Sequence, residues 1–313
     1  MATLSVPDPV PSPIEDAEKL RKAFQGWGTD EKAVIAVLAH RDAAQRKQIA
    51  LAYEEKYNEN LIKRLESELS GDFERAVYRW IFDPVEREAI MANVALKSKN
   101  VDYIVIIEIA SVNSPDELLA VKRAYQARYK HSLEEDIASH TTGDFRALLF
   151  ALVSTYRYNG EEINANLAQS EAKILHEAIT KGVFNHEEII RILGTRSKAQ
   201  LLATFNRYKD EYGSSITKAL TSETPNDFAL ALRTAIRSIS NPKKYFAKVL
   251  RNAIDKSGTD EDALTRVIVT RAEKDLKVIK EIFQKRANVA LEHAIGKEIS
   301  GDYKNFLLAL VGN

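Results

Sequence analysis

Apolar residues recur along the chain at intervals of three and four positions, which is the spacing of amphipathic α-helices. Leu118, Val121 and Tyr125 form one such series. Helix start signals are frequent: the Ser-Pro-Ile-Glu run at 12–15 combines an N-cap serine, a proline at the first helical position and a capping-box glutamate. No alternating pattern bounded by hairpin turns indicates a strand. The pattern therefore predicts an all-α fold of short helices joined by short connections.

This helical pattern occurs in four copies. An Asp-Phe or Asp-Tyr dipeptide opens an apolar helical segment at residues 72, 144, 227 and 302. A second apolar segment, which reads VIAVLAHR in the first copy, lies about 31 residues before each dipeptide. Two markers that recur in the same order predict four copies of one structural unit.

The positions of these markers divide the chain into a tail, four repeats and a linker. We predict an extended tail at 1–13, repeats at 14–82, 83–157, 170–240 and 241–313, and a polar linker at 158–169. Because the linker lies between the second and third repeats, we expect it to join two halves of two consecutive repeats each.

Composition narrows the range of partners. Lys+Arg and Asp+Glu are equal at 45 each, so the chain has no net charge and no general attraction to nucleic acid or to an anionic membrane. We therefore expect no nucleic-acid partner, and any membrane binding must come from local geometry or from a bound cation. The absence of cysteine excludes disulfides, thiolate zinc sites and thiol catalysis. The start lacks a signal-peptide pattern and no apolar run is long enough for a membrane span, so we expect a soluble, cytoplasmic protein.

The first and fourth repeats carry the same loop followed by the same acid. Residues 24–30 read FQGWGTD where one predicted helix ends and the next begins, and Glu68 lies 38 residues after Asp30. Residues 254–260 read IDKSGTD, and Glu298 follows at the same distance. A glycine-rich turn lets backbone carbonyls converge, because glycine adopts conformations that other residues avoid. We expect the threonine and the aspartate of each loop to cap the next helix.

These groups predict a calcium site. Three carbonyl oxygens and one bidentate glutamate supply fewer oxygens than the six to eight that Ca²⁺ takes, so positions remain for water or for a phosphate oxygen. Mg²⁺ is disfavoured, because it requires a tighter octahedron and sheds water reluctantly. Only one formal negative charge faces the ion. We therefore expect a weak intrinsic affinity that improves when a lipid phosphate completes the coordination shell.

The second and third repeats lack parts of this pattern. In the second repeat the loop register, 97–101, reads KSKNV, and His140 stands at the position of the acid. We expect this repeat not to bind calcium. In the third repeat the register reads KGVFN at 181–185, although Glu223 keeps the spacing of the acid. We expect that site to be empty or very weak.

The loop, the acid 38 residues later and the four units resemble the annexin family, and two intact terminal sites are similar to its plant branch. The resemblance covers residues 14–313. It implies a slightly curved disc of about five short helices per repeat, with calcium loops on the convex face that meets the bilayer. It implies two sets of ligands: the carbonyls of Phe24, Gly26 and Gly28 with Glu68, and the carbonyls of Ile254, Lys256 and Gly258 with Glu298. It also implies weaker calcium positions at Thr29, Glu31, Thr259 and Glu261.

Two side chains of the loops are candidates for lipid contact. Trp27 stands between two glycines, and we favour an exposed indole that enters the headgroup region over packing against a neighbouring helix. Lys256 replaces the first glycine of the family's loop. Its side chain either meets an anionic headgroup or remains solvated.

The leading function is calcium-dependent, non-enzymatic binding to anionic phospholipid membranes. One alternative is an enzyme: His40 resembles a histidine linked to peroxidase activity in plant annexins, and a nucleotide phosphatase is a further option, although no intact phosphate-binding loop is present. Another alternative is a calcium-independent scaffold that binds actin through residues 190–192, which read IRI. Arg41, Arg196 and Arg271 recur at one register, and we expect them to form structural salt bridges or bonds to helix-end carbonyls rather than lipid contacts.

Overall fold

The computed structural model describes residues 1–180, 186–221, 226–255 and 258–312, and these residues form twenty α-helices and no strand. Each predicted repeat contains five helices, so the all-α fold of four repeats is confirmed. None of the described helices is both long and apolar enough to cross a bilayer.

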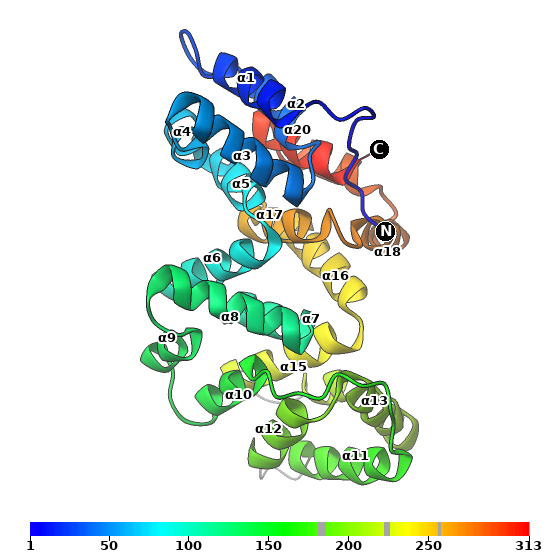
Figure 1. The fold of residues 1–313 in the computed structure, drawn as a ribbon. Helices are drawn as coiled ribbons and strands as arrows, with labels where there is room; N and C mark the ends of the chain where they lie inside the picture. Colours follow the sequence, from blue (N-terminus) through cyan, green and yellow to red (C-terminus); the bar gives the residue numbers. More distant parts are fainter. Residues whose placement is uncertain (181–185, 222–225, 256–257, 313) are drawn as a thin grey trace. The chain divides into compact units, whose positions relative to one another are not determined.

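The chain divides into two compact units, and the first unit consists of the first and fourth repeats. It comprises Met1–Arg87 and the segment from Lys243 onward. Its helices are α1 (Pro13–Ala23), α2 (Glu31–Leu38), α3 (Ala43–Tyr57), α4 (Leu61–Glu68) and α5 (Gly71–Ile81), with α16 (Pro242–Asp255), α17 (Glu261–Arg271), α18 (Leu276–Ala287), α19 (Leu291–Glu298) and α20 (Gly301–Val311). Helix α20 packs against α2 and α5, and α17 packs against α5 (Figure 1).

The second unit, Glu88–Pro242, consists of the second and third repeats. Its helices are α6 (Pro84–Lys97), whose first turn belongs to the first unit, α7 (Tyr103–Val112), α8 (Pro115–Tyr129), α9 (Leu133–His140) and α10 (Gly143–Val153), with α11 (Ala165–Thr180), α12 (His186–Thr195), α13 (Lys198–Tyr212), α14 (Ile216–Ala219) and α15 (Asp227–Ser240). Helix α15 packs against α7, and α10 packs against α12.

This division contradicts the expectation that the linker joins two halves of consecutive repeats. The linker connects two repeats of the same unit, whereas the first repeat pairs with the fourth. The reason is the packing of apolar helix faces that lie far apart in sequence. Phe73 of α5 and Phe306 of α20, for example, meet edge to face with ring centroids 5.8 Å apart.

The irregular segments also differ from the predicted boundaries. Helix α11 begins at Ala165, inside the segment predicted as a linker, so the irregular stretch runs from 154 to 164. The tail before α1 is extended and is held by the fourth repeat. The Thr3 amide donates to the Ala272 carbonyl at 2.9 Å, and the Thr3 hydroxyl donates to the Leu310 carbonyl at 2.7 Å.

A buried tryptophan fixes the helix that follows Glu68. Trp80 of α5 is fully buried, and its indole N–H donates to the Leu38 carbonyl of α2 at 2.7 Å. The Arg46 guanidinium of α3 lies 3.8 Å from the centre of the Trp80 ring system. These contacts tie α5 to α2 and α3, so the turn between α4 and α5 has a defined position next to the loop that precedes α2.

Candidate metal centres

The loop of the first repeat turns back on itself through two glycines. Helix α1 ends at Ala23, and the Asp30 amide donates to the Ala23 carbonyl at 2.8 Å, which closes the loop. Gly26 and Gly28 have φ of 108° and 86°, in the region that side chains disfavour. A Cβ at either position would meet no atom within 4 Å. Backbone conformation, rather than space, therefore requires glycine here.

The loop of the fourth repeat has the same closure. The Asp260 amide donates to the Ala253 carbonyl at 2.9 Å, and Gly258 has φ of 94°. Ile254 lies in the last turn of α16. Lys256, a predicted ligand and lipid contact, lies outside the described residues.

An arginine joins the two parts of the first site. The Arg64 guanidinium donates to the Glu68 carboxylate, with Nη2 and Oε1 2.7 Å apart. The same nitrogen lies 3.2 Å from the Phe24 carbonyl oxygen. A carbonyl and a carboxylate predicted to share one ion therefore already share one cation. Sequence reasoning missed Arg64, because the matching residues of the second and fourth repeats are Asp136 and Ala294 and no recurrence marks this position.

Thr29 does not cap the following helix, contrary to expectation. Its hydroxyl donates to Glu68 Oε2 at 2.5 Å, whereas Asp30 alone accepts from the Ala33 amide at 3.0 Å. The reason is that α4 ends at Glu68, next to the loop, so the Thr29 hydroxyl lies beside a carboxylate. A charged acceptor forms a stronger hydrogen bond than a backbone group does. Thr29 thus orients the carboxylate of the first site.

The acid of the fourth site is less constrained. Ala294 stands where the first repeat has Arg64, so no guanidinium occupies this place. Among the residues that the structure describes, the exposed Glu298 carboxylate has no hydrogen-bond or ion-pair partner. The two loops are therefore closed by the same hydrogen bond, and the two sites differ in the contacts that the glutamate makes.

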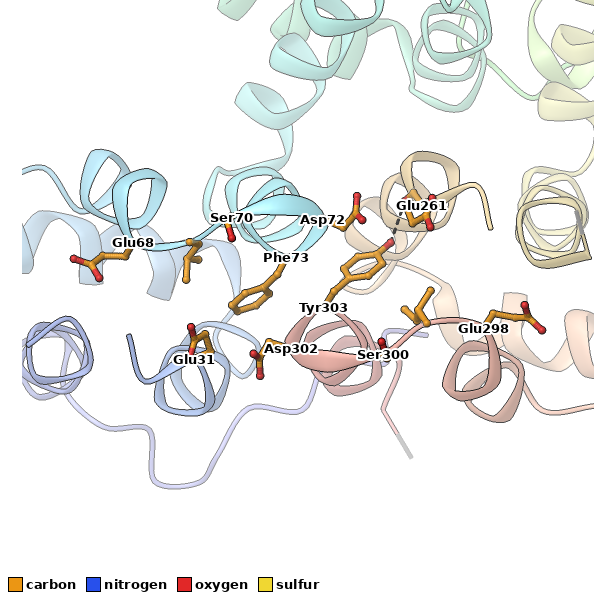
Figure 2. A pocket seen from close by; sticks show the side chains of 12 residues that line it. Glu31, Glu68, Ser70, Asp72, Phe73, Glu261, Glu298, Ser300, Asp302 and Tyr303 are labelled. Carbon is orange, nitrogen blue, oxygen red and sulfur yellow. Dashed lines mark hydrogen bonds between the residues drawn. The ribbon is translucent and has the colours of Figure 1, made fainter. Parts of the chain in front are cut away.

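The two sites lie at opposite ends of a polar cavity of about 440 Å³ between the first and fourth repeats. Figure 2 shows Glu68 and Glu298 pointing away from each other, with Phe73 and Tyr303 between them. The Tyr303 hydroxyl donates to the Glu261 carbonyl at 3.1 Å, and burial raises the pKa of this phenol. The carbonyl of a predicted weaker ligand is therefore already hydrogen-bonded.

Each predicted site relies on one carboxylate. In the described part of the chain, no three His, Asp or Glu side chains are grouped as they are in a side-chain metal site.

In the second repeat, a side chain of the loop itself contacts the carbonyl oxygens of Ala95 and Asn100. The Ser98 hydroxyl contacts the carbonyl oxygens of Ala95, at 2.9 Å, and Asn100, at 2.6 Å. Lys97 Nζ lies 3.2 Å from Asp136 Oδ1. The first residue of this loop register thus forms an ion pair with α9. In the third repeat, residues 181–185 and Glu223 lie outside the described residues.

Trp27 extends into solvent. Its side chain is fully exposed, at 109% of the reference area. The structure therefore favours the exposed indole over packing against a neighbouring helix. A large apolar ring in water between two glycines is available for contact with another surface.

The recurring arginines form ion pairs within their repeats, as expected. Arg41 makes two short contacts with Asp16, at 2.7 and 2.9 Å, and both side chains are buried. The corresponding pairs in the third and fourth repeats are Arg196 with Glu171 and Arg271 with Asp275. These arginines tie helices together.

His40 and Arg191, the residues of the two alternative functions, contact other groups of the protein. His40 Nδ1 lies 3.0 Å from the Ser5 carbonyl oxygen of the tail. The Arg191 guanidinium pairs with Glu188 at 2.8 Å and with Glu171 at 3.4 Å, and Ile192 is buried. Neither contact favours a peroxidase or an actin-binding scaffold.

The fold and the loops together define a helical repeat protein whose first and fourth repeats carry a glycine loop and a glutamate at the end of the fourth helix of the repeat. The family model described as Annexin matches four segments, at residues 15–80, 87–152, 170–234 and 245–310. The chain belongs to the annexin family.

Relatives and solved structures agree with this assignment over the whole chain. The annexin-like protein RJ4 of Fragaria ananassa is 64% identical over 312 residues, which cover all of this chain and 99% of that protein. The structure of annexin III superposes with a TM-score of 0.93 at 32% identity, covering 100% of this chain and 97% of that one. A calcium-bound annexin (Sm)1 superposes with a TM-score of 0.84 at 29% identity, covering 100% and 93%.

Proposed function

We propose that this annexin binds anionic phospholipid membranes in a calcium-dependent manner through the loops of its first and fourth repeats. Calcium-dependent phospholipid binding is the general activity of the family. Assignment to these two repeats rests on their glycine turns and on the glutamate that approaches each of them. We propose that the protein has no catalytic activity, and that it is cytoplasmic until calcium recruits it to a membrane.

The observation that carries this proposal is the position of the Arg64 guanidinium. It lies between the Phe24 carbonyl and the Glu68 carboxylate, at 3.2 and 2.7 Å. Carbonyl and carboxylate oxygens are hard ligands that suit calcium, and here they already converge on one positive charge. The donor set of the first site therefore fits the ion.

Carbonyl and carboxylate groups of the first repeat would both bind the ion. Phe24, Gly26 and Gly28 would offer carbonyl oxygens, and Glu68 would add its carboxylate, held by the Thr29 hydroxyl. When bound, the ion supplies positive charge that a lipid phosphate can share. Because this set contains one carboxylate, binding depends on that second anion, and the protein responds to calcium and lipid together.

The fourth repeat offers the matching set of Ile254, Lys256, Gly258 and Glu298. Ala294 stands here in place of the arginine, and Glu298 forms no ion pair among the described residues. We propose that the fourth site loads at lower calcium than the first. Weaker positions are proposed at the loop threonines and the first helical glutamates, which are Thr29, Glu31, Thr259 and Glu261.

Contact with lipid would extend beyond the ion. The exposed Trp27 indole is amphipathic, with an apolar body and one N–H, and such rings favour the headgroup region of a bilayer. Lys256 is proposed to meet an anionic headgroup beside the fourth site.

Vesicle sedimentation tests the proposal. Phosphatidylcholine vesicles with and without phosphatidylserine are mixed with the protein over a calcium series and with a chelator. We expect binding that requires both calcium and phosphatidylserine, and its loss in a Glu68→Gln, Glu298→Gln double variant. The matched control is Glu66→Gln with Glu281→Gln, which removes the same charge from exposed positions. Chelator-resistant binding to phosphatidylserine, or normal binding by the double variant, contradicts the proposal.

A further inference from the structure

A second cavity lies beside the fourth repeat's loop, on the side of α16, α18 and α19. Its volume is about 500 Å³. Basic side chains line it from all three helices: Arg251 from α16, Arg286 from α18, and His293 and Lys297 from α19. Phe283 and Ala294 are buried at its base.

The charges around this cavity do not balance. Arg251, Arg286 and Lys297 are positive, while Asp255 and Glu298 are the acids that line it. Arg251 is paired with Asp255 on the same helix, at 3.0 Å. Within the described residues, Arg286 and Lys297 have no hydrogen-bond or ion-pair partner. Arg286 and Lys297 therefore line the cavity without an ion-pair partner among the described residues, and the lysines, arginines and carboxylates that line it sum to one positive charge.

In the first repeat, acidic and bulky side chains fill the region that corresponds to this cavity. There the Glu59 carboxylate accepts from Arg21 at 2.6 Å and from the Tyr53 hydroxyl at 2.9 Å, and it forms an ion pair with Arg64 at 3.5 Å. Arg21 corresponds to Arg251 by register. The first repeat thus closes the region with a network of ion pairs.

The fourth repeat lacks two acids that form ion pairs in this region of the first repeat. Val289 stands in place of Glu59, and Lys248 stands in place of Glu18, which pairs with Lys56 in the first repeat. The arginine at the register of Lys56 is Arg286. The basic residues are kept while their acidic partners are replaced.

The bulky side chains have changed as well. Alanines stand in the fourth repeat at the registers of Tyr57 and Arg64, namely Ala287 and Ala294. Smaller side chains open the space, and the missing acids leave its cations uncompensated. Both changes are those that an anion-binding cavity requires.

We propose that this cavity binds a phosphate monoester, carried either by a lipid headgroup or by a free phosphorylated molecule. Guanidinium groups match phosphate oxygens with two parallel hydrogen bonds, and lysine adds a compact positive charge. The base formed by Phe283 and Ala294 can contact a ring that carries the phosphate. The site does not depend on calcium, because its cations are on the chain.

Glu298 couples this cavity to the proposed calcium site. Its carboxylate lines the cavity and opposes an anion there. Removing that charge with Glu298→Gln should tighten phosphate binding about twofold in the presence of chelator. The same variant should weaken calcium-dependent binding to phosphatidylserine. Opposite responses to one substitution separate this inference from the function proposed above.

The test uses the full chain in chelator. One arm measures sedimentation with phosphatidylcholine vesicles that contain phosphatidylinositol phosphate, and the other measures the heat of binding of soluble inositol trisphosphate. We expect binding in at least one arm, weakened at least about tenfold by Arg286→Gln with Lys297→Gln. Vesicle binding identifies the lipid headgroup as the source, and binding of the soluble compound alone identifies a free phosphate.

The control is Lys285→Gln with Lys47→Gln, which removes two exposed positive charges that do not line the cavity. It should bind as the unmodified protein does. Circular dichroism melting should show that both double variants are folded. Absence of binding in both arms, or an equal loss in the control, overturns the proposal.

Discussion

In an Arg64→Ala variant, the guanidinium between the Phe24 carbonyl and the Glu68 carboxylate is removed. Calcium at the first site needs these same two oxygens, so in the unmodified protein it must first displace the arginine. The variant should therefore bind calcium more tightly at this site. The change leaves Thr29 to orient Glu68 through its 2.5 Å hydrogen bond.

The size of the effect follows from the exposure of the pair. Arg64 and Glu68 are 29% and 18% exposed, and they stand four residues apart on α4. A partly exposed pair of this kind contributes up to about 1 kcal/mol. The bond to the Phe24 carbonyl adds about 1 kcal/mol. Displaced Arg64 keeps its contact with Glu59, at 3.5 Å, which offsets part of the cost. The net is about 1 kcal/mol, or roughly a fivefold tighter site.

Terbium luminescence can report on the first site alone. Trp27 lies in that loop, so its indole can excite a terbium ion bound in place of calcium, and calcium then displaces the signal. The measurement is made in a Glu298→Gln background, which silences the fourth site. We expect the calcium midpoint to fall about fivefold in Arg64→Ala.

The matched control is Lys63→Ala. Lys63 is exposed on the same helix, and its removal takes away the same charge without touching Glu68. A long-range field effect would shift both variants equally, whereas displacement of a contact shifts only Arg64→Ala. An unchanged or higher calcium midpoint in Arg64→Ala would refute the reasoning.

Four further predictions concern the loops and the core. Trp27→Ala should leave the calcium affinity of the free protein unchanged and weaken vesicle binding about tenfold, as measured by sedimentation. Gly28→Ala should lower the free energy of unfolding by about 1 kcal/mol, because alanine resists a φ of 86°, and thermal melting checks this. Arg41→Met should cost about 3 to 5 kcal/mol in urea unfolding, because it leaves Asp16 buried without its partner. Burial lowers the pKa of Lys198 to about 8, below its ordinary value of 10.5. The unfolded chain then binds the extra proton between these values, so the stability contribution of this group should rise with pH from about 8 to 10.5. Lys198→Met should flatten that rise in urea unfolding.

The glycine turns of the two candidate calcium loops could be predicted from sequence. Gly26 and Gly28 are local signals, since the backbone conformation of a turn depends on the residues in it. Glu68 could be placed because the same spacing recurs in the fourth repeat. Arg64 could not be placed, because its contact with Phe24 depends on how α4 lies against the loop. The prediction that Thr29 caps the next helix was wrong for the same reason.

What the sequence determined by itself is what nearby residues decide: helices from the spacing of apolar positions, helix starts from caps, and four repeats from recurrence. The tertiary structure alone decided that the first repeat pairs with the fourth and the second with the third. It also decided that the fourth repeat encloses a basic cavity where the first has Glu59. These outcomes depend on helix faces and charges that meet across large distances in the chain, and no local pattern records which faces will meet.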